Sequence, residues 1–178
     1  MTSVGIFFGS TDGATARIAQ LMKEKLDALL VAGDEQCVEL FDIAESDLTP
    51  MVRFDRLILG VPTWNTGQLQ RDWEKALDES ANLDLSGKCA AIFGLGDQQG
   101  YPATFVDAMV FVADFVRSAG ARLVGAWPIA GYTFTNSWAI EDNRFLGLVL
   151  DEHSQPDLTE TRIDQWLRQL QLEFDESP

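Results

Sequence analysis

Residues Ser3–Thr15, SVGIFFGSTDGAT, indicate the class of fold, because an apolar run is followed there by small polar residues and then by a helix. The run Ser3–Gly9 is typical of a strand that is buried on both faces. The apolar positions that follow have the three- and four-residue spacing of one helical face: Ile18, Leu21, Met22, Leu26 and Leu29. This spacing predicts a helix from about Ala14 to Val31 that stops at Gly33.

The same alternation of strand and helix continues along the chain. Further strands are predicted at Gln36–Glu39, Arg56–Val61 (closed by Pro62), Lys88–Leu95 and Arg122–Trp127. Further helices are predicted at Leu69–Glu79, Phe105–Ala119 and Leu158–Phe174, the last with Asp157 as its N-cap. Near-continuous apolar strands between helices predict an α/β fold with an open, doubly wound parallel sheet. The segment 131–156 does not fit the alternation, and a loop of that length is more often functional or partly ordered.

Length and charge narrow the class of protein. A chain of 178 residues without a linker or repeat predicts one domain, 1–178. The 28 acidic and 13 basic residues give a net charge of −15, which makes nucleic acid and anionic membranes poor partners and basic protein faces good ones. We expect no membrane span, because no uncharged apolar run approaches about 20 residues. No Lys or Arg precedes the first apolar stretch, so we expect no secretory signal and a cytoplasmic location.

Cysteine and histidine are scarce. Cys37 and Cys89 lie far apart in strand-like contexts, which favours buried thiols in a reducing cytoplasm over a disulfide or metal pair. The single histidine, His153, lies in the polar stretch DEHSQPD and is predicted to be a surface residue. We therefore expect no metal site and no catalytic residue of the Cys–His or Ser–His type. Any chemistry is left to a cofactor.

Open sheets of this kind bind ligands beyond the carboxyl ends of their strands. The first strand leads into Gly9–Thr15, where small residues and a helix N-terminus provide converging N–H groups for a phosphate. The same residues also form an ordinary capped turn. PTWNTG (62–67) follows the second strong strand and GDQQGY (96–101) the third, so that Trp64 and Tyr101 lie at the same end of the sheet. Either aromatic alone is more often a packing residue, but together with the loop they suit a flat, phosphate-bearing ring system.

These three motifs, GSTDGAT, PTWNTG and GLGDQQGY, resemble those of the flavodoxins, small electron carriers that bind FMN. The resemblance extends over essentially the whole chain. GYTFTNSWAIEDNRFLGLVLDE and DLTETRIDQWLRQL resemble the inserted loop and the final helix of the long-chain subgroup. The resemblance implies a flavodoxin-like doubly wound five-stranded parallel sheet of order 2-1-3-4-5. It also implies an insertion, 131–156, in the last strand, with Phe145–Leu150 rejoining the sheet edge.

The resemblance further implies which residues bind FMN. The phosphate loop would consist of Ser10, Thr11, Asp12, Gly13, Ala14 and Thr15. The ribityl chain and ring would be met by Pro62, Thr63, Trp64, Asn65, Thr66, Gly67, Leu95, Gly96, Asp97, Tyr101 and Thr104. Trp64 would cover one face of the ring and Tyr101 the other. The backbone of 65–67 would meet flavin N5, and the backbone of 95–97 would meet the pyrimidine edge.

Asp12 departs from the family, which usually has Thr at this place in the loop. A carboxylate among the phosphate donors would repel the phosphate by about 1 kcal/mol or more at close range. The favoured interpretation is that Asp12 faces solvent or caps the helix, because Asp is a strong N-cap residue. The alternative is weakened FMN binding or a different ligand.

Charge predicts the function that the bound flavin would serve. A fully reduced flavin is an anion, which Asp97 and the net charge of −15 disfavour, whereas a neutral semiquinone is not penalised. Gly67 allows the Thr66–Gly67 peptide to flip and present its carbonyl to N5. We therefore expect a low-potential one-electron carrier working on the semiquinone/hydroquinone couple, not an enzyme. The alternatives are an FMN-dependent NAD(P)H:quinone-type oxidoreductase and a flavodoxin-like module with weakened FMN binding.

Acidic residues predict the kind of partner. Those expected near the exposed flavin edge are Asp72, Glu74, Asp97, Glu141 and Asp142. Each alone is more often a solubilising surface charge, but together they would steer a basic docking face to the site. The resemblance implies partners such as a ferredoxin–NADP reductase or another low-potential oxidoreductase, which the protein would serve in place of a ferredoxin. We expect a monomer, because no large exposed apolar stripe is visible.

Overall fold

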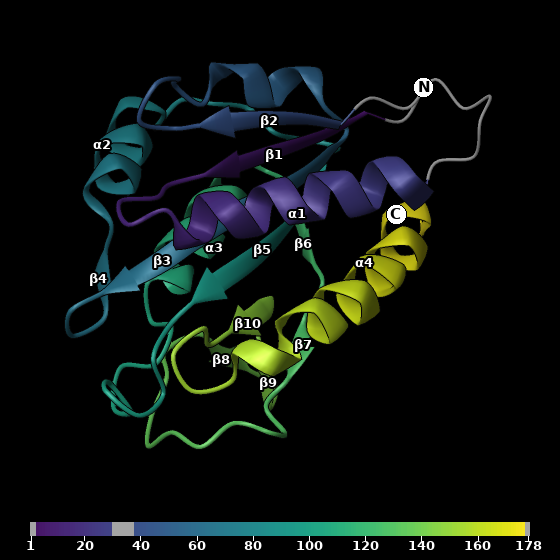
Figure 1. Ribbon diagram of the computed structural model, residues 1–178. Helices are drawn as coiled ribbons and strands as arrows, with labels where there is room; N and C mark the ends of the chain where they lie inside the picture. The colour runs from purple at the N-terminus through teal and green to yellow at the C-terminus, as the bar shows by residue number, and fades with distance from the viewer. Residues whose placement is uncertain (1–2, 30–37, 177–178) are drawn as a thin grey trace.

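The computed structural model describes residues 3–29 and 38–176, and a parallel sheet forms its centre (Figure 1). The sheet runs in the order β2 (Val38–Asp42), β1 (Val4–Phe8), β3 (Arg56–Trp64) and β5 (Cys89–Leu95). Beyond β5 lie β6 (Arg122–Val124) and β10 (Leu148–Leu150). The flavodoxin-like doubly wound α/β sheet is thereby confirmed, with β5 in the fourth place of the predicted order and β6 and β10 sharing the fifth.

Helices cover both faces of this sheet. Figure 1 shows α1 (Ala14–Leu29) and α4 (Thr159–Asp175) on the near side and α3 (Met109–Ser118) on the far side. The remaining helix, α2, spans Arg71–Glu79. In the described ranges, no helix has both the length and the hydropathy that a membrane span requires.

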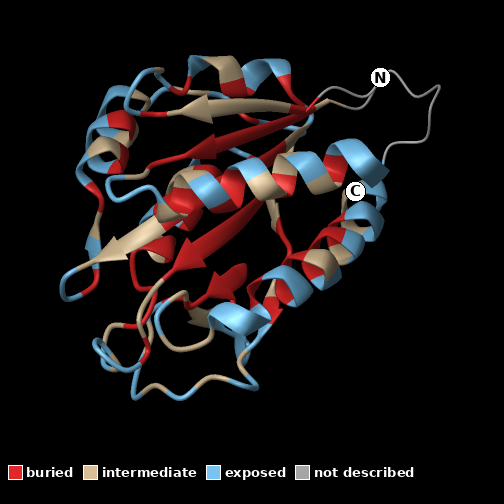
Figure 2. Cartoon of the chain, viewed as in Figure 1, coloured by how far each residue is buried: buried red, intermediate tan, exposed pale blue. Residues whose placement is uncertain are grey.

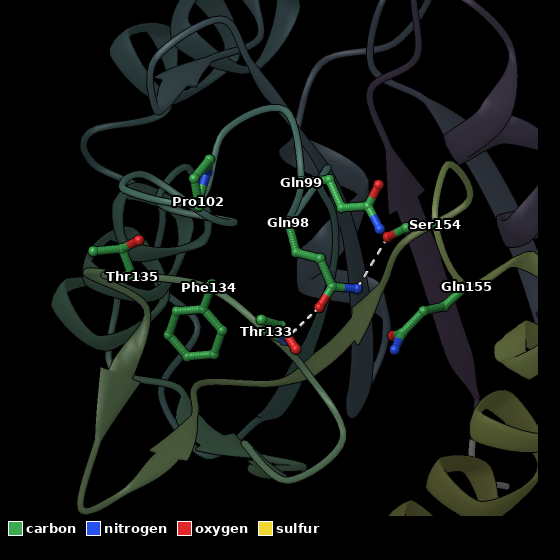
Figure 3. A pocket seen from close by; sticks show the side chains of 8 residues that line it. All are labelled: Gln98, Gln99, Pro102, Thr133, Phe134, Thr135, Ser154 and Gln155. Atoms are coloured by element: carbon green, nitrogen blue, oxygen red, sulfur yellow. Dashed lines mark hydrogen bonds between the residues drawn. The ribbon is translucent and has the colours of Figure 1, made fainter.

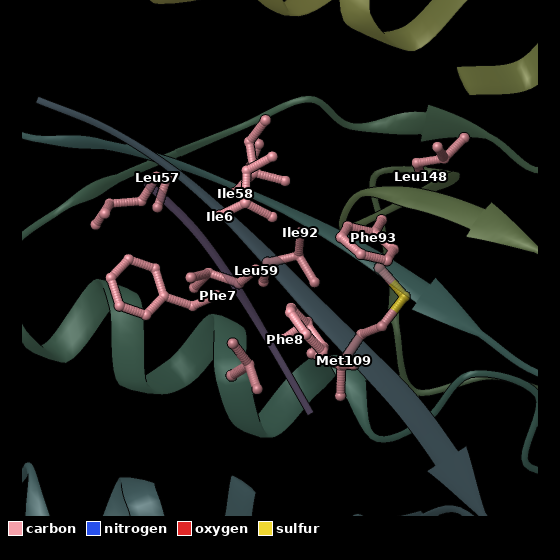
Figure 4. Packing of buried hydrophobic residues seen from close by; sticks show 14 of the residues in the cluster. Ile6, Phe7, Phe8, Leu57, Ile58, Leu59, Ile92, Phe93, Met109 and Leu148 are labelled. Carbon is pink, nitrogen blue, oxygen red and sulfur yellow. The ribbon is translucent and has the colours of Figure 1, made fainter. Parts of the chain in front are cut away.

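The core lies between the sheet and its helices. All of β1 is buried, and so is β5 apart from its first residue, as expected for strands that are covered on both faces. Ile6, Leu59 and Ile92 come from three adjacent strands, have no exposed surface and lie close together in Figure 4. Figure 2 shows the buried central strands and the exposed outer faces of α1 and α4. This packing fixes the carboxyl ends of β1, β3 and β5 relative to one another.

The last place in the sheet is filled by two segments of the chain. Arg122 pairs with Cys89, whereas Leu148 pairs with Phe93 further along β5. The prediction of one strand over 122–127 is wrong beyond Val124, because Gly125 adopts a φ of +82° and turns the chain away. An excursion therefore leaves the sheet at Gly125, earlier than the predicted 131, and returns at Leu148.

The excursion carries a small antiparallel sheet of its own. Its strands are β7 (Trp127–Pro128), β9 (Arg144–Phe145) and β8 (Ile140–Glu141), in that order. Phe145 belongs to β9, so only Leu148–Leu150 of the predicted segment 145–150 rejoins the main sheet. The long-chain insertion is thus a folded element rather than an irregular loop.

Two predicted boundaries are wrong for local reasons. Pro62 does not close β3, which runs on to Trp64 because Thr63 and Trp64 pair with the short antiparallel strand β4 (Gln68–Leu69). Helix α3 begins at Met109 rather than Phe105, because Val106 has a φ of +52°, which a right-handed helix excludes.

Three further boundaries differ by a few residues. Helix α2 begins at Arg71 rather than Leu69, because Gln70 is its N-cap and accepts a hydrogen bond from the backbone of Trp73. Asp157 is not the N-cap of α4, since it lies in a short 3-10 helix, Pro156–Leu158, directly before it. Strand β2 begins at Val38; the predicted stop of α1 near Gly33 and the prediction for Cys37 fall outside the described residues.

Candidate functional site

A cavity of about 260 Å³ opens where the main strands end. Four segments line it, and each lies at or directly after the carboxyl end of a strand of the sheet: β1, β3, β5 and β10. The lining residues are Asp12, Ala14, Thr15, Pro62, Thr63, Trp64, Asn65, Leu95, Gly96, Asp97, Tyr101, Glu152 and His153. The structure therefore brings the three sequence motifs together at one place.

The turn from β1 into α1 forms one side of the cavity. Gly13 has a φ of +91°, and the helix begins at the next residue, so the N–H groups of its first turn have no partner within the helix. Thr15 is 1% exposed, and its Oγ1 is buried without a hydrogen-bond partner among the described residues. A helix N-terminus beside an unpaired buried hydroxyl is a donor set suited to an anion such as a phosphate.

Asp12 is exposed and caps this turn. Its Oδ1 accepts a hydrogen bond of 3.1 Å from the backbone N–H of Ala14. The favoured interpretation from the sequence, a solvent-facing helix cap, agrees with this geometry. The bond also occupies one N–H group at the helix start and leaves a carboxylate at the rim of the cavity.

Trp64, at the end of β3, and Tyr101, in the loop that follows β5, line the same cavity. The indole Nε1 of Trp64 is buried and has no hydrogen-bond partner in the described part of the chain. The Tyr101 side chain is 45% exposed, which is unusual for an aromatic ring that packs only against protein. The two rings therefore provide flat apolar surfaces beside the anion-binding turn.

Asp97 shapes the third loop. Its Oδ1 accepts hydrogen bonds from the backbone N–H groups of Gln99 (3.0 Å) and Gly100 (2.8 Å). The backbone N–H of Tyr101 in turn donates to the Asp97 carbonyl at 2.9 Å. These bonds fix the loop that carries Tyr101 and hold a second carboxylate at the cavity wall.

Six residues that the sequence placed in the site are not among those that line the cavity: Ser10, Thr11, Gly13, Thr66, Gly67 and Thr104. The hydroxyl of Ser10 accepts a hydrogen bond from the Gly13 N–H at 3.1 Å. That of Thr11 accepts one from Gln70 Nε2 at 3.2 Å. A Cβ on Gly67 would lie 3.2 Å from the Cβ of Thr104, so these two residues pack on each other.

Glu152 and His153 also line the cavity, although no sequence motif predicted them there. His153 is exposed, as predicted, and Glu152 forms an ion pair with Arg17 of α1. Both are placed by the buried Asp151, whose Oδ2 accepts hydrogen bonds from the backbone and side-chain nitrogens of Gln98. Burial raises the pKa of Asp151, but these bonds and those from Ser154 outweigh it and hold the pKa below its usual range. No local pattern in DEHSQPD signals this contact, which depends on β10 returning beside β5.

A second cavity, of about 520 Å³, lies between the Asp97 loop and the excursion (Figure 3). Gln98 connects its walls, because its Nε2 donates to Ser154 Oγ at 3.1 Å and its Oε1 accepts from the Thr133 N–H at 2.5 Å. The two bonds appear as dashed lines in Figure 3. The cavity loops are thus braced by the excursion.

The acidic residues of the excursion do not join those of the site. Glu141 makes a bidentate ion pair with Arg117, with both N···O distances at 2.7 Å, and this pairing lowers the pKa of Glu141. Glu141 and Asp142 line a third cavity together with Arg117, Arg122 and Arg144, and that cavity shares no residue with the first. Of the five acidic residues predicted near the flavin edge, only Asp97 lines the first cavity, and Asp72 and Glu74 lie in the first turn of α2.

Comparison with known proteins gives one consistent family. The family model for Flavodoxin matches residues 6–166. A flavodoxin of Synechococcus elongatus is 43% identical over 174 residues, which cover 98% of this chain and 99% of that one. Flavodoxin 1 of Escherichia coli is 38% identical over 175 residues, covering 98% of this chain and 96% of that one.

Among solved structures, the flavodoxin of Fusobacterium nucleatum bound to flavin mononucleotide superposes with a TM-score of 0.89. It is 28% identical, and the match covers 98% of this chain and 100% of that one.

Proposed function

This chain belongs to the flavodoxin family, and on that basis we propose that it is a low-potential one-electron carrier with non-covalently bound FMN. One observation supports this most strongly. A buried, unpaired Thr15 hydroxyl at a helix N-terminus lies in the same cavity as two aromatic side chains from separate segments. That donor set fits a ligand with a phosphate at one end and a flat ring at the other.

The proposed binding roles follow the placement of the residues. The first turn of α1 and the Thr15 hydroxyl bind the phosphate, with Ser10, Thr11 and Gly13 holding the loop in shape. Trp64 and Tyr101 enclose the ring, and Thr63, which lines the same cavity, meets the ribityl chain. Leu95, Gly96 and Asp97 also line the cavity, and their backbone groups would hold the pyrimidine edge.

When bound, FMN supplies the redox chemistry, and the chain tunes it. Asp12, Asp97 and Glu152 all line the cavity, so additional negative charge inside it is disfavoured. This is the physical basis for a low reduction potential. Gly67, with a φ of +86°, gives the Thr66–Gly67 peptide a conformational freedom that a side chain would remove.

The partners that we propose are redox proteins with basic docking faces, such as a ferredoxin–NADP reductase or a low-potential oxidoreductase. Half-exposed Tyr101 and the carboxylates at the cavity rim support this, because like charges repel acidic partners and opposite charges accelerate docking. We also propose that the protein acts as a carrier rather than an enzyme, as a monomer and in the cytoplasm. Cys89, which was predicted to be a buried thiol, is half-buried.

The test is an anaerobic reductive titration of the purified, FMN-loaded protein, followed by its visible spectrum. We expect reduction in two separate one-electron steps. Reduction in a single two-electron step, together with NAD(P)H oxidation in the absence of any reductase, would favour the oxidoreductase alternative. Protein that stays colourless after FMN is added would refute the carrier function and would point to Asp12 as the cause.

A further inference from the structure

The excursion lies along the segment 102–107, which connects β5 to α3. The backbone N–H of Thr135 donates to the carbonyl of Pro102 at 2.7 Å. Ser137 Oγ donates to the carbonyl of Phe105 at 2.5 Å. The two segments therefore form a hydrogen-bonded pair, and a shift in one displaces the other.

The end of the segment 102–107 contacts the loops that follow β3 and β5, two of the four segments at the cavity. A Cβ on Gly96 would come within 2.8 Å of Val106 Cγ1, and a Cβ on Gly67 would come within 3.0 Å of Asp107 Oδ2. Directly after it, the Ala108 N–H donates to Thr63 Oγ1 at 3.3 Å. The segment is therefore wedged between the excursion and the loops that follow β3 and β5.

Asp107 is the residue that reaches both sides. It is 1% exposed; its Oδ1 accepts a hydrogen bond of 2.7 Å from the Trp138 backbone N–H, while its Oδ2 faces Gly67. Burial of the carboxyl raises the pKa of Asp107, and the bond from Trp138 only partly offsets this effect. Burying a carboxyl group is costly unless hydrogen bonds compensate the burial.

The backbone before Asp107 is strained. Val106 is β-branched, fully buried and has a φ of +52°, a conformation that such residues rarely adopt. Strained conformations persist only where the surrounding contacts enforce them. Here those contacts are the excursion on one side and the glycines of the loops that follow β3 and β5 on the other.

We propose that Asp107 is a positioning residue for the cofactor-facing loop at Gly67, and that through it the excursion braces this loop. The inference rests on the proposed function, because it assigns the inserted segment a role in tuning bound FMN. Contact with Gly67 restricts the Thr66–Gly67 peptide, and the bond to Trp138 keeps the carboxyl in contact. Loss of the carboxyl frees the peptide and changes the relative ease of the two one-electron steps.

The experiment compares Asp107→Ala with Asp107→Asn in the full-length, FMN-loaded chain. Asn keeps the shape and an acceptor oxygen for the Trp138 N–H, whereas Ala removes both. Trp138→Ala is the matched control, because it removes an exposed side chain but leaves the backbone N–H in place. The readouts are hydrogen exchange of the Trp138 amide and the separation of the two one-electron potentials.

For Asp107→Ala we expect Trp138 amide exchange to be about tenfold faster, from loss of a hydrogen bond to a charged group. We expect the ratio of the two one-electron equilibrium constants to change about tenfold, which is about 59 mV in their separation. Asp107→Asn and Trp138→Ala are both expected to stay within about twofold of the wild type in each readout. Ser137→Ala, which loosens the same pair of segments from the excursion side, provides the test if Asp107→Ala fails to fold. It is expected to give smaller changes in the same direction in both readouts.

Two results would overturn the inference. If Asp107→Asn shifts the potentials as far as Asp107→Ala, the residue acts by its charge and not by position. If Asp107→Ala speeds hydrogen exchange of the Trp138 amide but leaves the separation of the two potentials unchanged, Asp107 holds the excursion and does not position the loop at Gly67. Failure of the wild type to bind FMN would instead refute the proposed function. Hydrogen exchange of the Trp138 amide could still be measured in the FMN-free protein, and it would still test the contact between Asp107 and the excursion.

Discussion

Replacement of Thr15 by Val should move stability and FMN affinity in opposite directions. The two side chains have nearly the same shape and the same restricted χ1, so the change removes a hydroxyl and little else. In the protein without FMN, Thr15 Oγ1 is buried and lacks a partner among the described residues. An unsatisfied buried hydroxyl costs about 1–3 kcal/mol, so its removal should raise the free energy of unfolding by about 1 kcal/mol.

The same substitution should weaken FMN binding. A hydrogen bond to a charged phosphate contributes about 1.5–3 kcal/mol, and its loss corresponds to a rise in Kd of about 10- to 150-fold. Urea unfolding of the FMN-free protein measures the first effect, with a rise in Tm of about 2–4 °C as a second readout. Quenching of flavin fluorescence on titration with protein measures the second.

Thr159→Val is the matched control, because Thr159 is 4% exposed but its hydroxyl donates to Glu152 Oε1. This variant should lose about 1 kcal/mol of stability, because the hydrogen bond from Thr159 to Glu152 is lost. The reasoning fails if Thr15→Val destabilises the FMN-free protein as Thr159→Val does. It also fails if FMN affinity changes by less than about twofold.

Three further predictions concern charge, pH and packing. Asp12→Asn keeps the cap on Ala14 but removes a like charge, so FMN affinity measured by calorimetry should rise about fivefold, or about 1 kcal/mol; unchanged affinity would show that Asp12 is fully screened. Burial raises the pKa of Tyr132 to about 12, so between pH 10 and 12 only the unfolded chain loses this proton, and the free energy of unfolding should fall by about 2 kcal/mol. Urea titrations at stepped pH should show this slope in the wild type and not in Tyr132→Phe. Gly147→Ala should cost about 3 kcal/mol in urea unfolding, since its Cβ would lie 1.9 Å from the Ile92 carbonyl oxygen; a loss below about 1 kcal/mol would contradict this clash.

The parallel sheet and the cavity were predictable because local patterns determine them. The apolar runs at β1, β3 and β5 are long enough to indicate buried strands, and the motifs that follow them must meet at one edge of a parallel sheet. Trp64, Tyr101 and Thr15 accordingly line one cavity. The capping role preferred for Asp12 also follows from a local rule, the preference of Asp for helix starts.

The remaining features depend on contacts between distant parts of the chain. Val106 has a positive φ because of what surrounds it, so no propensity could have placed the start of α3 at Met109. Glu152 and His153 reach the cavity only because β10 pairs with β5. Glu141 pairs with Arg117, which lies in the last turn of another helix. Such pairings carry no signal within a short window of sequence.

The divided last strand has a use in protein engineering. Because β6 and β10 fill one place in the sheet from two segments, the chain between Val124 and Leu148 can change its content without altering the order of the core strands. A receptor domain grafted into the outer turn of this excursion, near Asp142 and Asn143, would sit at a point where the backbone already reverses. Because the excursion braces the loop at Gly67, ligand binding to such a graft would change the reduction potentials of bound FMN. The ligand would then control the rate at which the protein transfers electrons.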